Sequence, residues 1–292
     1  MNGHAFHPGK QGVMNLDWSR TKTIFIWVFL VLNLFLYTQY LESYKEGEKI
    51  EVLGETVEIE ARLKEDNITY IALPNNKESA AYYSGQIKNF SPSEVPYFPN
   101  QSAKIENNNK LVVTMDKPVK LQKSDTRDSY TDFVHNNVYE GDSYVLWNID
   151  EEKKEATFFQ KVNDVTLYYN VRGYVKLYWD DNNRIVSYEQ TMLEEHKKLD
   201  KEQNLLTARQ VLQILYGKNL LKPDSQITEM NLGYSTIVQL TQTQVFAPTW
   251  EVRVKLADDT EEIHFVNAVQ GRIVEIQNDL TEIVEQTEDL EE

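Results

Sequence analysis

The stretch "DWSRTKTIFIWVFLVLNLFLYTQYLE" (Asp17–Glu42) decides the architecture of this chain. Its apolar run from Ile24 to Tyr37 contains one polar residue, Asn33. With tolerant flanks the run reaches about 20 residues, or about 30 Å of helix, which matches the hydrocarbon core of a bilayer. A secretory signal has a shorter apolar run followed by small residues at a cleavage site, and no such site follows here. We therefore predict an uncleaved transmembrane helix over residues 21–41.

The charges that flank this helix predict its orientation. Lys10, Arg20 and Lys22 precede it, whereas residues 42–48 carry mixed charges that are mainly acidic. Basic flanks stay on the cytoplasmic side of a membrane, so Arg20 and Lys22 are the residues expected to set the topology. Residues 1–20 then form a cytoplasmic tail, and the chain beyond the helix is extracellular. We expect a single-pass protein of the cell membrane.

Both ends of the chain are left out of the predicted fold. Residues 1–13 show no periodicity and precede Met14, so they are an extension, a remnant of cloning or an over-long start. Eight acidic residues and no basic residue follow Arg272. Such a run predicts an acidic flexible tail over residues 279–292.

Composition excludes several classes of function. The chain is 41% hydrophobic and 11% aromatic, which supports a packed core. It carries a net charge of −16, and because residues 1–44 carry +1, the remainder carries −17. This charge argues against nucleic acid, whose phosphates need clustered bases. The absence of cysteine excludes disulfides, thiol catalysis and Cys-based metal sites.

The segment after the anchor predicts a first α+β domain over residues 42–150. Alternating or short apolar runs predict strands, three prolines predict a loop, and helical spacing of apolar residues predicts a short helix. The strands are expected in "TVEIEARL" (56–63), "ITYIAL" (68–73) and "KLVVTM" (110–115), the loop over 89–102 and the helix over 127–141. A hairpin, "YVLWNIDEEKKEATFFQKV" (144–162), is expected to follow.

A second α+β domain is predicted over residues 151–278. Alternation on both sides of Asp180–Asn183 predicts a hairpin, and "LLTARQVLQILYGKNLLKP" (205–223) predicts a helix with Thr207 as N-cap. The charged stretch 194–201 predicts a solvated helical edge or a linker. Further strands are expected over 231–239, 248–256, 261–269 and 272–277. The fold class is thus α+β, with two extracytoplasmic domains of antiparallel sheet and packed helices.

A search for catalytic chemistry finds no signature. The five histidines (His4, His7, His135, His196 and His264) form no HExxH or H-x-H pattern, and the usual serine, phosphate and dinucleotide motifs are absent. "EEHKK" around His196 lacks a second ligand at helical spacing, so it predicts a solvated histidine. The pairs Asp180–Asp181 and Asp258–Asp259 fit turn chemistry better than acid–base catalysis. We predict no catalytic, metal or cofactor site, and no enzyme.

Two features of the sequence leave a binding function open. The aromatic cluster Tyr168, Tyr169, Tyr174, Tyr178 and Trp179 is either a sugar or peptide platform or, as is usual for aromatic strands, part of a core. Asn33 lies within the membrane helix, where an amide gains from a partner on another helix. The candidate contact face consists of Ile26, Phe29, Asn33, Leu36 and Tyr37. The alternative is that Asn33 tolerates lipid at modest cost.

The block "DWSRTKTIFI" (Asp17–Ile26), running straight into a single membrane helix, resembles the start of the YycI (WalI) family. The hairpin "VKLYWDDNNRIVSYEQT" and the 205–223 helix are similar to that family as well, so the resemblance covers residues 14–278. It implies a non-enzymatic regulator of YycG (WalK), the sensor kinase of the YycG/YycF (WalK/WalR) two-component system that controls cell-wall metabolism in Gram-positive bacteria. It also implies action together with YycH (WalH), through membrane-helix and outer-domain contacts, and two domains similar to those of YycH.

Two other functions compete with this one. The 248–277 hairpin, with its Trp-bearing strand and Gly271 turn, is similar to a PepSY-type inhibitory or chaperone module for a peptidase. A cell-wall hydrolase or sugar binder needs a pair of carboxylates in a cleft.

Overall fold

The computed structural model describes residues 18–48, 56–75, 79–95, 98–121, 127–199 and 201–276. The predicted extension 1–13 and the predicted acidic tail 279–292 lie outside these residues. Contacts divide the chain into two units, Met1–Leu53 and Gly54–Glu292.

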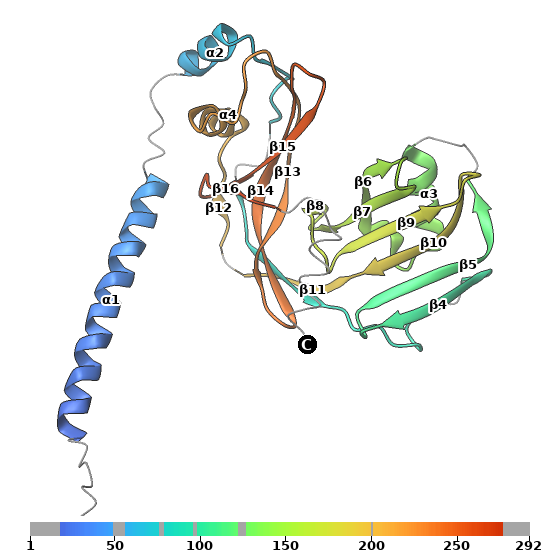
Figure 1. Cartoon of the computed structure of the whole chain (residues 1–292), viewed down its shortest axis with the longest axis horizontal. Coiled ribbons are helices and arrows are strands. Elements are labelled where there is room, and N and C mark those ends of the chain that lie inside the picture. The colour runs from blue at the N-terminus through green and yellow to red at the C-terminus, as the bar shows by residue number, and fades with distance from the viewer. Residues whose placement is uncertain are drawn as a thin grey trace, which may run out of the picture. The chain divides into compact units, whose positions relative to one another are not determined.

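The described part of the first unit is one helix, α1 (Trp18–Glu48), drawn in blue in Figure 1. It contains the predicted membrane segment and extends past both of its ends. The stretch Lys22–Gln39 is long and apolar enough to cross a membrane, and none of it is buried within the structure. The exposed fraction of its large apolar side chains lies between 50% for Leu32 and 70% for Phe25. An exposed apolar surface of this extent calls for a non-aqueous environment, so the structure supports the predicted anchor.

The second unit has the predicted α+β class, with antiparallel pairing dominant in its main sheet. In chain order its elements are α2 (Thr56–Glu65), β1 (Thr69–Tyr70), β2 (Ser79–Ala80), β3 (Tyr83–Ile87), β4 (Gln101–Glu106), β5 (Lys110–Lys120), α3 (Arg127–Asn137), the 3-10 helix η1 (Gly141–Ser143), β6 (Tyr144–Asp150), β7 (Glu155–Val162), β8 (Val165–Tyr168), β9 (Tyr174–Trp179), β10 (Arg184–Thr191), β11 (Leu193–Lys198), β12 (Gln203–Asn204), α4 (Ala208–Gly217), β13 (Gln226–Gln239), β14 (Thr243–Lys255), β15 (Glu261–Asn267) and β16 (Ile273–Val274).

The main sheet runs in the order β11-β3-β14-β13-β8-β7-β9-β10-β5-β4. Strand β8 links the two halves of this sheet, because it pairs with β7 on one side and with β13 on the other. Strands β6, β15 and β1 add to β7, β14 and β13, β16 adds to β15, and β2 and β12 form a separate pair. Most pairs are antiparallel, whereas β1 and β8 pair with β13 in parallel. Figure 1 shows the β4–β10 half and the β13–β16 half on either side of β8.

Helix α3 covers one face of the first half of the sheet. Its buried residues Phe133 and Val134 belong to the same core cluster as Phe158, Leu177 and Ile185. The predicted alternation of the β9–β10 hairpin places Leu177 and Ile185 on the covered face. The predicted helix and both predicted hairpins of this half are therefore confirmed.

Helix α4 covers the second half. Thr207 caps it in a capping box with Gln210, as predicted for the N-cap. The buried side chains of α4 lie in one core cluster with Trp250 and Val252 of β14. The indole Nε1 of Trp250 donates to Leu206 O at 2.9 Å, which satisfies the buried N–H.

Two predicted elements are wrong. "TVEIEARL" was expected to be a strand and is helix α2, because its apolar residues Ile59 and Leu63 are also four apart and both enter the α4 core. Glu, Ala, Arg and Leu favour helix, which resolves the ambiguous pattern. The charged stretch 194–201, expected to be a helical edge or linker, contains strand β11 paired with β3. Its charges blunt the exposed edge of the sheet.

The expected domain boundary near residue 150 falls within the turn of the β6–β7 hairpin. Strands β1 and β3 of the expected first domain pair with β13 and β14 of the expected second. Strand pairing thus joins the two segments across that boundary. Whether residues 42–150 and 151–278 fold as separate domains stays a prediction.

Candidate functional site

The predicted contact face of α1 is exposed, as a partner surface requires. Ile26, Phe29, Leu36 and Tyr37 all present more than half of their surface. The Nδ2 of Asn33 donates to Phe29 O one turn back, at 2.9 Å. This bond satisfies one amide N–H within the helix, and an asparagine amide has a second N–H and a carbonyl oxygen to offer.

A shallow apolar hollow on α1 is lined by Phe25, Ile26, Phe29, Leu30 and Asn33. Three of the five predicted contact residues therefore line it, and Leu36 and Tyr37 lie further along the helix. Large side chains that flank a hollow offer a neighbouring helix a surface to pack against. The contact role of these five residues stays a prediction.

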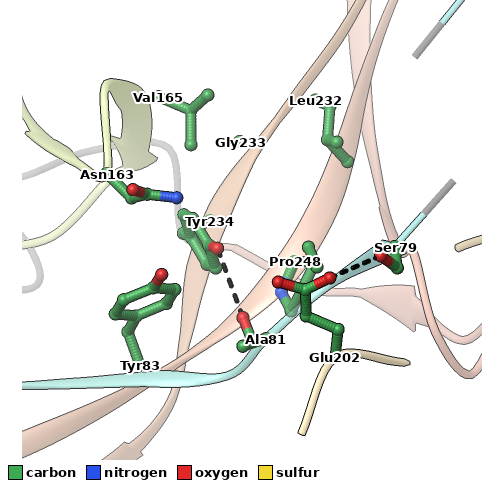
Figure 2. A pocket seen from close by; sticks show the side chains of 11 residues that line it. Ser79, Ala81, Tyr83, Asn163, Val165, Glu202, Leu232, Gly233, Tyr234 and Pro248 are labelled. Carbon is green, nitrogen blue, oxygen red and sulfur yellow. Dashed lines mark hydrogen bonds between the residues drawn. The ribbon is translucent and has the colours of Figure 1, made fainter. Parts of the chain in front are cut away.

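A pocket of about 460 Å³ lies over the β13–β14 pair, beside the place where β8 pairs with β13 (Figure 2). Its floor is formed by Leu232 and Tyr234 of β13 and Pro248 of β14. Tyr234 and Pro248 are register partners, so adjacent strands supply one continuous floor. The volume falls in the range of small-molecule sites.

One wall of the pocket depends on a glycine. A Cβ on Gly233 would lie 2.5 Å from Thr166 O and from Tyr168 Cε2, so only glycine lets β8 approach β13 this closely. That approach places Asn163 and Val165, in and after the β7–β8 turn, at the pocket. Figure 2 shows both side chains on the side of the pocket opposite Ser79 and Glu202.

The opposite wall is polar. The Oγ of Ser79 donates to Glu202 Oε2 at 2.7 Å, and Lys198 Nζ donates to Glu202 Oε1 at 3.0 Å. The β2–β12 pair brings the segments of Ser79 and Glu202 together, although they are far apart in sequence. Tyr234 OH donates to Ala81 O at 3.2 Å, which fixes the segment between β2 and β3 over the floor. The pocket was not predicted from sequence, because the contacts that assemble it, from Ser79 to Glu202 and from Tyr234 to Ala81, are long-range.

The predicted aromatic cluster does not form a platform. Tyr168, Tyr174 and Trp179 are buried, and Trp179 packs against Tyr130 of α3 in the first core. Tyr174 and Tyr178 both donate their hydroxyls to Glu189 Oε1, at 3.1 and 3.0 Å. Tyr174 shares a hydrophobic cluster with Tyr169, whereas Trp179 belongs to the core under α3, and the core alternative holds for the three buried rings.

A charged cluster lies on the face of β13–β14 away from α4. The guanidinium of Arg253 lies 4.5 Å from the ring centroid of Trp147, and its Nε donates to Glu251 Oε1 at 2.6 Å. Glu251 is only 1% exposed. Burial raises the pKa of its carboxyl, an effect opposed by Arg253 and Asn231. The strand predicted over 248–256 is part of β14, which buries side chains on both of its faces.

The aspartate pairs of the two hairpin turns stabilise those turns through hydrogen bonds to the backbone, as expected. Asp180 Oδ1 accepts from the N–H groups of Asn182 and Arg184, and Asp258 Oδ1 accepts from Thr260 N. Hydrogen bonds from the side chains of Arg184 and Thr260, together with these backbone bonds, lower the pKa of the Asp180 and Asp258 carboxyls. Among the residues that the structure describes, no group of three or more His, Asp or Glu side chains could hold a metal ion.

His264 on β15 supplies a pH-dependent prediction. Burial lowers its pKa below the ordinary 6.5, and nearby Glu262, with Nε2 to Oε2 at 3.5 Å, opposes this only in part. The unfolded chain then binds more protons than the folded one as pH falls below 6.5, so stability is lost on acidification.

We expect His264→Gln to lose less stability than the unchanged protein between pH 7.5 and pH 5.5. Urea unfolding at the two pH values measures this, and the other histidines are the same in both proteins. Equal losses would show that His264 does not contribute.

Comparison with known proteins adds the family. The YycI family, described as "YycI protein", matches residues 47–269, which begins after the predicted membrane segment and covers most of the chain. No curated protein matches.

Two solved structures are similar. An uncharacterized protein from Eubacterium rectale ATCC 33656 is 11% identical, with 73% of this chain and 92% of that chain covered and a TM-score of 0.45. The C-terminal domain of Bacillus megaterium YpeB is 14% identical, with 77% and 99% covered and a TM-score of 0.36. At these scores neither likeness carries an argument about function. The family match over residues 47–269 does carry such an argument. This chain belongs to the YycI family, the regulatory, non-catalytic proteins of the YycG/YycF two-component system.

Proposed function

We propose that this protein is a membrane-anchored, non-enzymatic regulator of the YycG (WalK) sensor histidine kinase, acting together with YycH (WalH) on cell-wall metabolism. The observation that carries the proposal is the exposed apolar stretch Lys22–Gln39 of α1, followed in the same chain by the family-matched residues 47–269. An anchor of this kind holds the regulator in the same bilayer as a membrane kinase. Encounter is then confined to two dimensions.

The proposed orientation has the N-terminus in the cytoplasm and the α+β fold outside the cell. It rests on Arg20 and Lys22 before the membrane segment and on the mixed, mainly acidic charges of residues 42–48 after it. Beyond residue 44 the chain carries a net charge of −17. So acidic a fold is repelled by anionic head groups, which favours contact with proteins over contact with the lipid surface. A pair of YycH-like domains is part of this proposal.

Regulation requires a contact that differs between the two states of the kinase. The proposed contact is helix packing along Ile26, Phe29, Asn33, Leu36 and Tyr37. Lipid tails are as apolar as these side chains, so apolar burial alone gives no drive for association. The amide of Asn33, beyond its bond to Phe29 O, supplies the polar interaction that packing in lipid uses.

Replacing Asn33 by leucine tests this contact. We expect Asn33→Leu to weaken association with the kinase by roughly 3- to 30-fold, the equivalent of about 0.6–2 kcal/mol for an interhelical hydrogen bond. Recovery of YycG with affinity-tagged protein, titrated in mild detergent, measures the change.

The double variant Asn33→Leu/Leu34→Asn is the matched control, since it keeps the composition of the helix and moves the amide to another face. Its association with the kinase is expected to stay as weak as that of Asn33→Leu. Unchanged recovery with Asn33→Leu, or full recovery with the double variant, would contradict a role for this face.

A further inference from the structure

Six neighbouring strands of the main sheet share one small core where the two halves of the sheet meet. They follow one another in the order β11-β3-β14-β13-β8-β7, and each strand has register partners in the next. The core takes one buried side chain from each of the six strands: Ile87, Val162, Leu167, Leu193, Tyr234 and Phe246. An interior filled by inward-facing side chains from every strand is typical of a small closed barrel.

The strand order leaves one opening in this ring, between β11 and β7. Among the residues that the structure describes, no strand pairing joins these two strands. The side-chain amide of Gln160 in β7 spans the opening. Its Nε2 donates to Leu193 O at 2.8 Å, and Leu193 N donates to its Oε1 at 2.8 Å. Two residues of an antiparallel pair exchange bonds in the same way, so the amide takes the place of a backbone pairing.

This contact between Gln160 and Leu193, here called the seam, is closed to water. Gln160 is 1% exposed and Leu193 is fully buried. Gly173 leaves room for the amide, because a Cβ there would lie 3.0 Å from Gln160 Oε1 and 3.3 Å from Leu193 Cδ1. A buried backbone group has no water as an alternative partner, so leaving it unpaired costs free energy. The exchange of bonds with Gln160 therefore holds β11 against β7.

The seam connects the two halves of the sheet directly. Strand β7 belongs to the first half through its pairing with β6 and β9. Strand β11 is attached to the second half through β3 and β14, and β14 carries the core beneath α4. A change in the angle between the halves would therefore have to open or deform the seam.

The other connections between the halves are short or involve β13 and β14. Strand β8 shares two register pairs with β7 and two with β13, whereas β13 and β14 pair along almost their whole length. Asn170, just after β8, donates to Thr236 Oγ1 and Gln244 Oε1 at 2.6 and 2.5 Å, and Arg253 of β14 lies over Trp147 of β6. None of these contacts joins β7 to β11. With the seam open, β8 would remain as a hinge between the halves.

We propose that the main sheet closes into a six-stranded barrel around β8, and that the amide of Gln160 is the latch that holds its two halves at one angle. The latched fold moves as a single rigid body, so a partner bound to one half displaces the other half as well. This inference goes beyond the proposed contact with the kinase, because it concerns the coupling between two halves of one fold.

A distance between the halves tests the latch. The chain contains no cysteine, so spin labels attach only where cysteine is introduced. Lys117→Cys in β5 and Lys218→Cys after α4 place one label on each half, both at exposed positions. Pulsed double electron–electron resonance on the full-length protein in lipid nanodiscs then gives the distribution of distances. We expect one narrow peak when the rest of the sequence is unchanged.

Gln160→Met opens the seam, because methionine is similar in shape and makes neither bond to Leu193. We expect it to broaden the distance distribution or to add a second peak. Hydrogen exchange of the peptide that contains Leu193 should become about 5- to 10-fold faster, as for the loss of one buried hydrogen bond.

Gln190→Met is the matched control. Gln190 is also fully buried, and its Nε2 donates to Tyr139 O and Tyr144 OH, both in the first half. Its replacement removes a buried amide without touching the seam, so the narrow peak should remain.

A broad distribution in the unchanged sequence would overturn the proposal, and this result does not depend on the folding of any variant. An unchanged narrow peak in Gln160→Met, or the same broadening in Gln190→Met, would overturn it as well. The measurement contains no kinase, so its failure leaves the proposed function untouched.

Discussion

Trp250→Ala is expected to lower the free energy of unfolding by about 3–5 kcal/mol, the usual cost of removing a large aromatic side chain from a core. Trp250 is fully buried in the cluster that joins α2 and α4 to β14. Its removal leaves a cavity beneath α4 and also frees Leu206 O, which accepts from the indole at 2.9 Å. Urea unfolding followed by far-ultraviolet circular dichroism measures the loss.

Trp250→Phe is the matched control, since it keeps most of the buried ring and loses the hydrogen bond. Its expected cost is smaller, about 1–3 kcal/mol for an unsatisfied carbonyl and a reduced volume. A Trp250→Ala protein within about 1 kcal/mol of the parent would show that α4 is not held by this cluster.

Gly141→Ala is expected to destabilise the fold by about 3 kcal/mol, because the added methyl group meets backbone and not a movable side chain. A Cβ at Gly141 would lie 2.1 Å from Val134 O and 2.8 Å from Val134 C, in helix α3. The helix or the start of β6 must shift to admit it. The thermal midpoint and the urea midpoint should both fall.

Gly217→Ala supplies the matched control in α4. No atom lies within 4 Å of a Cβ built there, so the substitution should be neutral or should stabilise the protein by up to about 1 kcal/mol. Equal effects at the two glycines would mean that the close approach at Gly141 does not exist in solution.

Local patterns predicted much of the fold. The hairpin around Asp180–Asn183 and the helix after Thr207 follow from side-chain periodicity and from turn and cap chemistry, which act within a few residues. Local patterns misled where two periods coincide: in "TVEIEARL", Ile59 and Leu63 satisfy both strand and helix spacing. Only contact with the distant α4 core decides between the two.

The pocket shows the limit of sequence reasoning more sharply. Ser79 and Glu202 are 123 positions apart, and Tyr234 and Ala81 are 153 apart. No short motif connects such residues, and Glu202 alone is one acid among many. The family of the chain was accessible from sequence by a different route, a resemblance that is carried first by Asp17–Ile26 and that the family match over residues 47–269 supports independently of the anchor.

Recovery of the kinase from membranes tests the central claim most directly. The tagged full-length protein is compared with a version in which residues 21–41 are replaced by an unrelated transmembrane helix, so that both proteins stay in the bilayer. We predict that YycG and YycH are recovered with the full-length protein, and that YycG is lost when the helix is exchanged. Recovery of YycG with both proteins would assign the contact to the outer fold. Recovery of an extracytoplasmic peptidase, with no kinase in either sample, would contradict the regulator account and favour the inhibitory module.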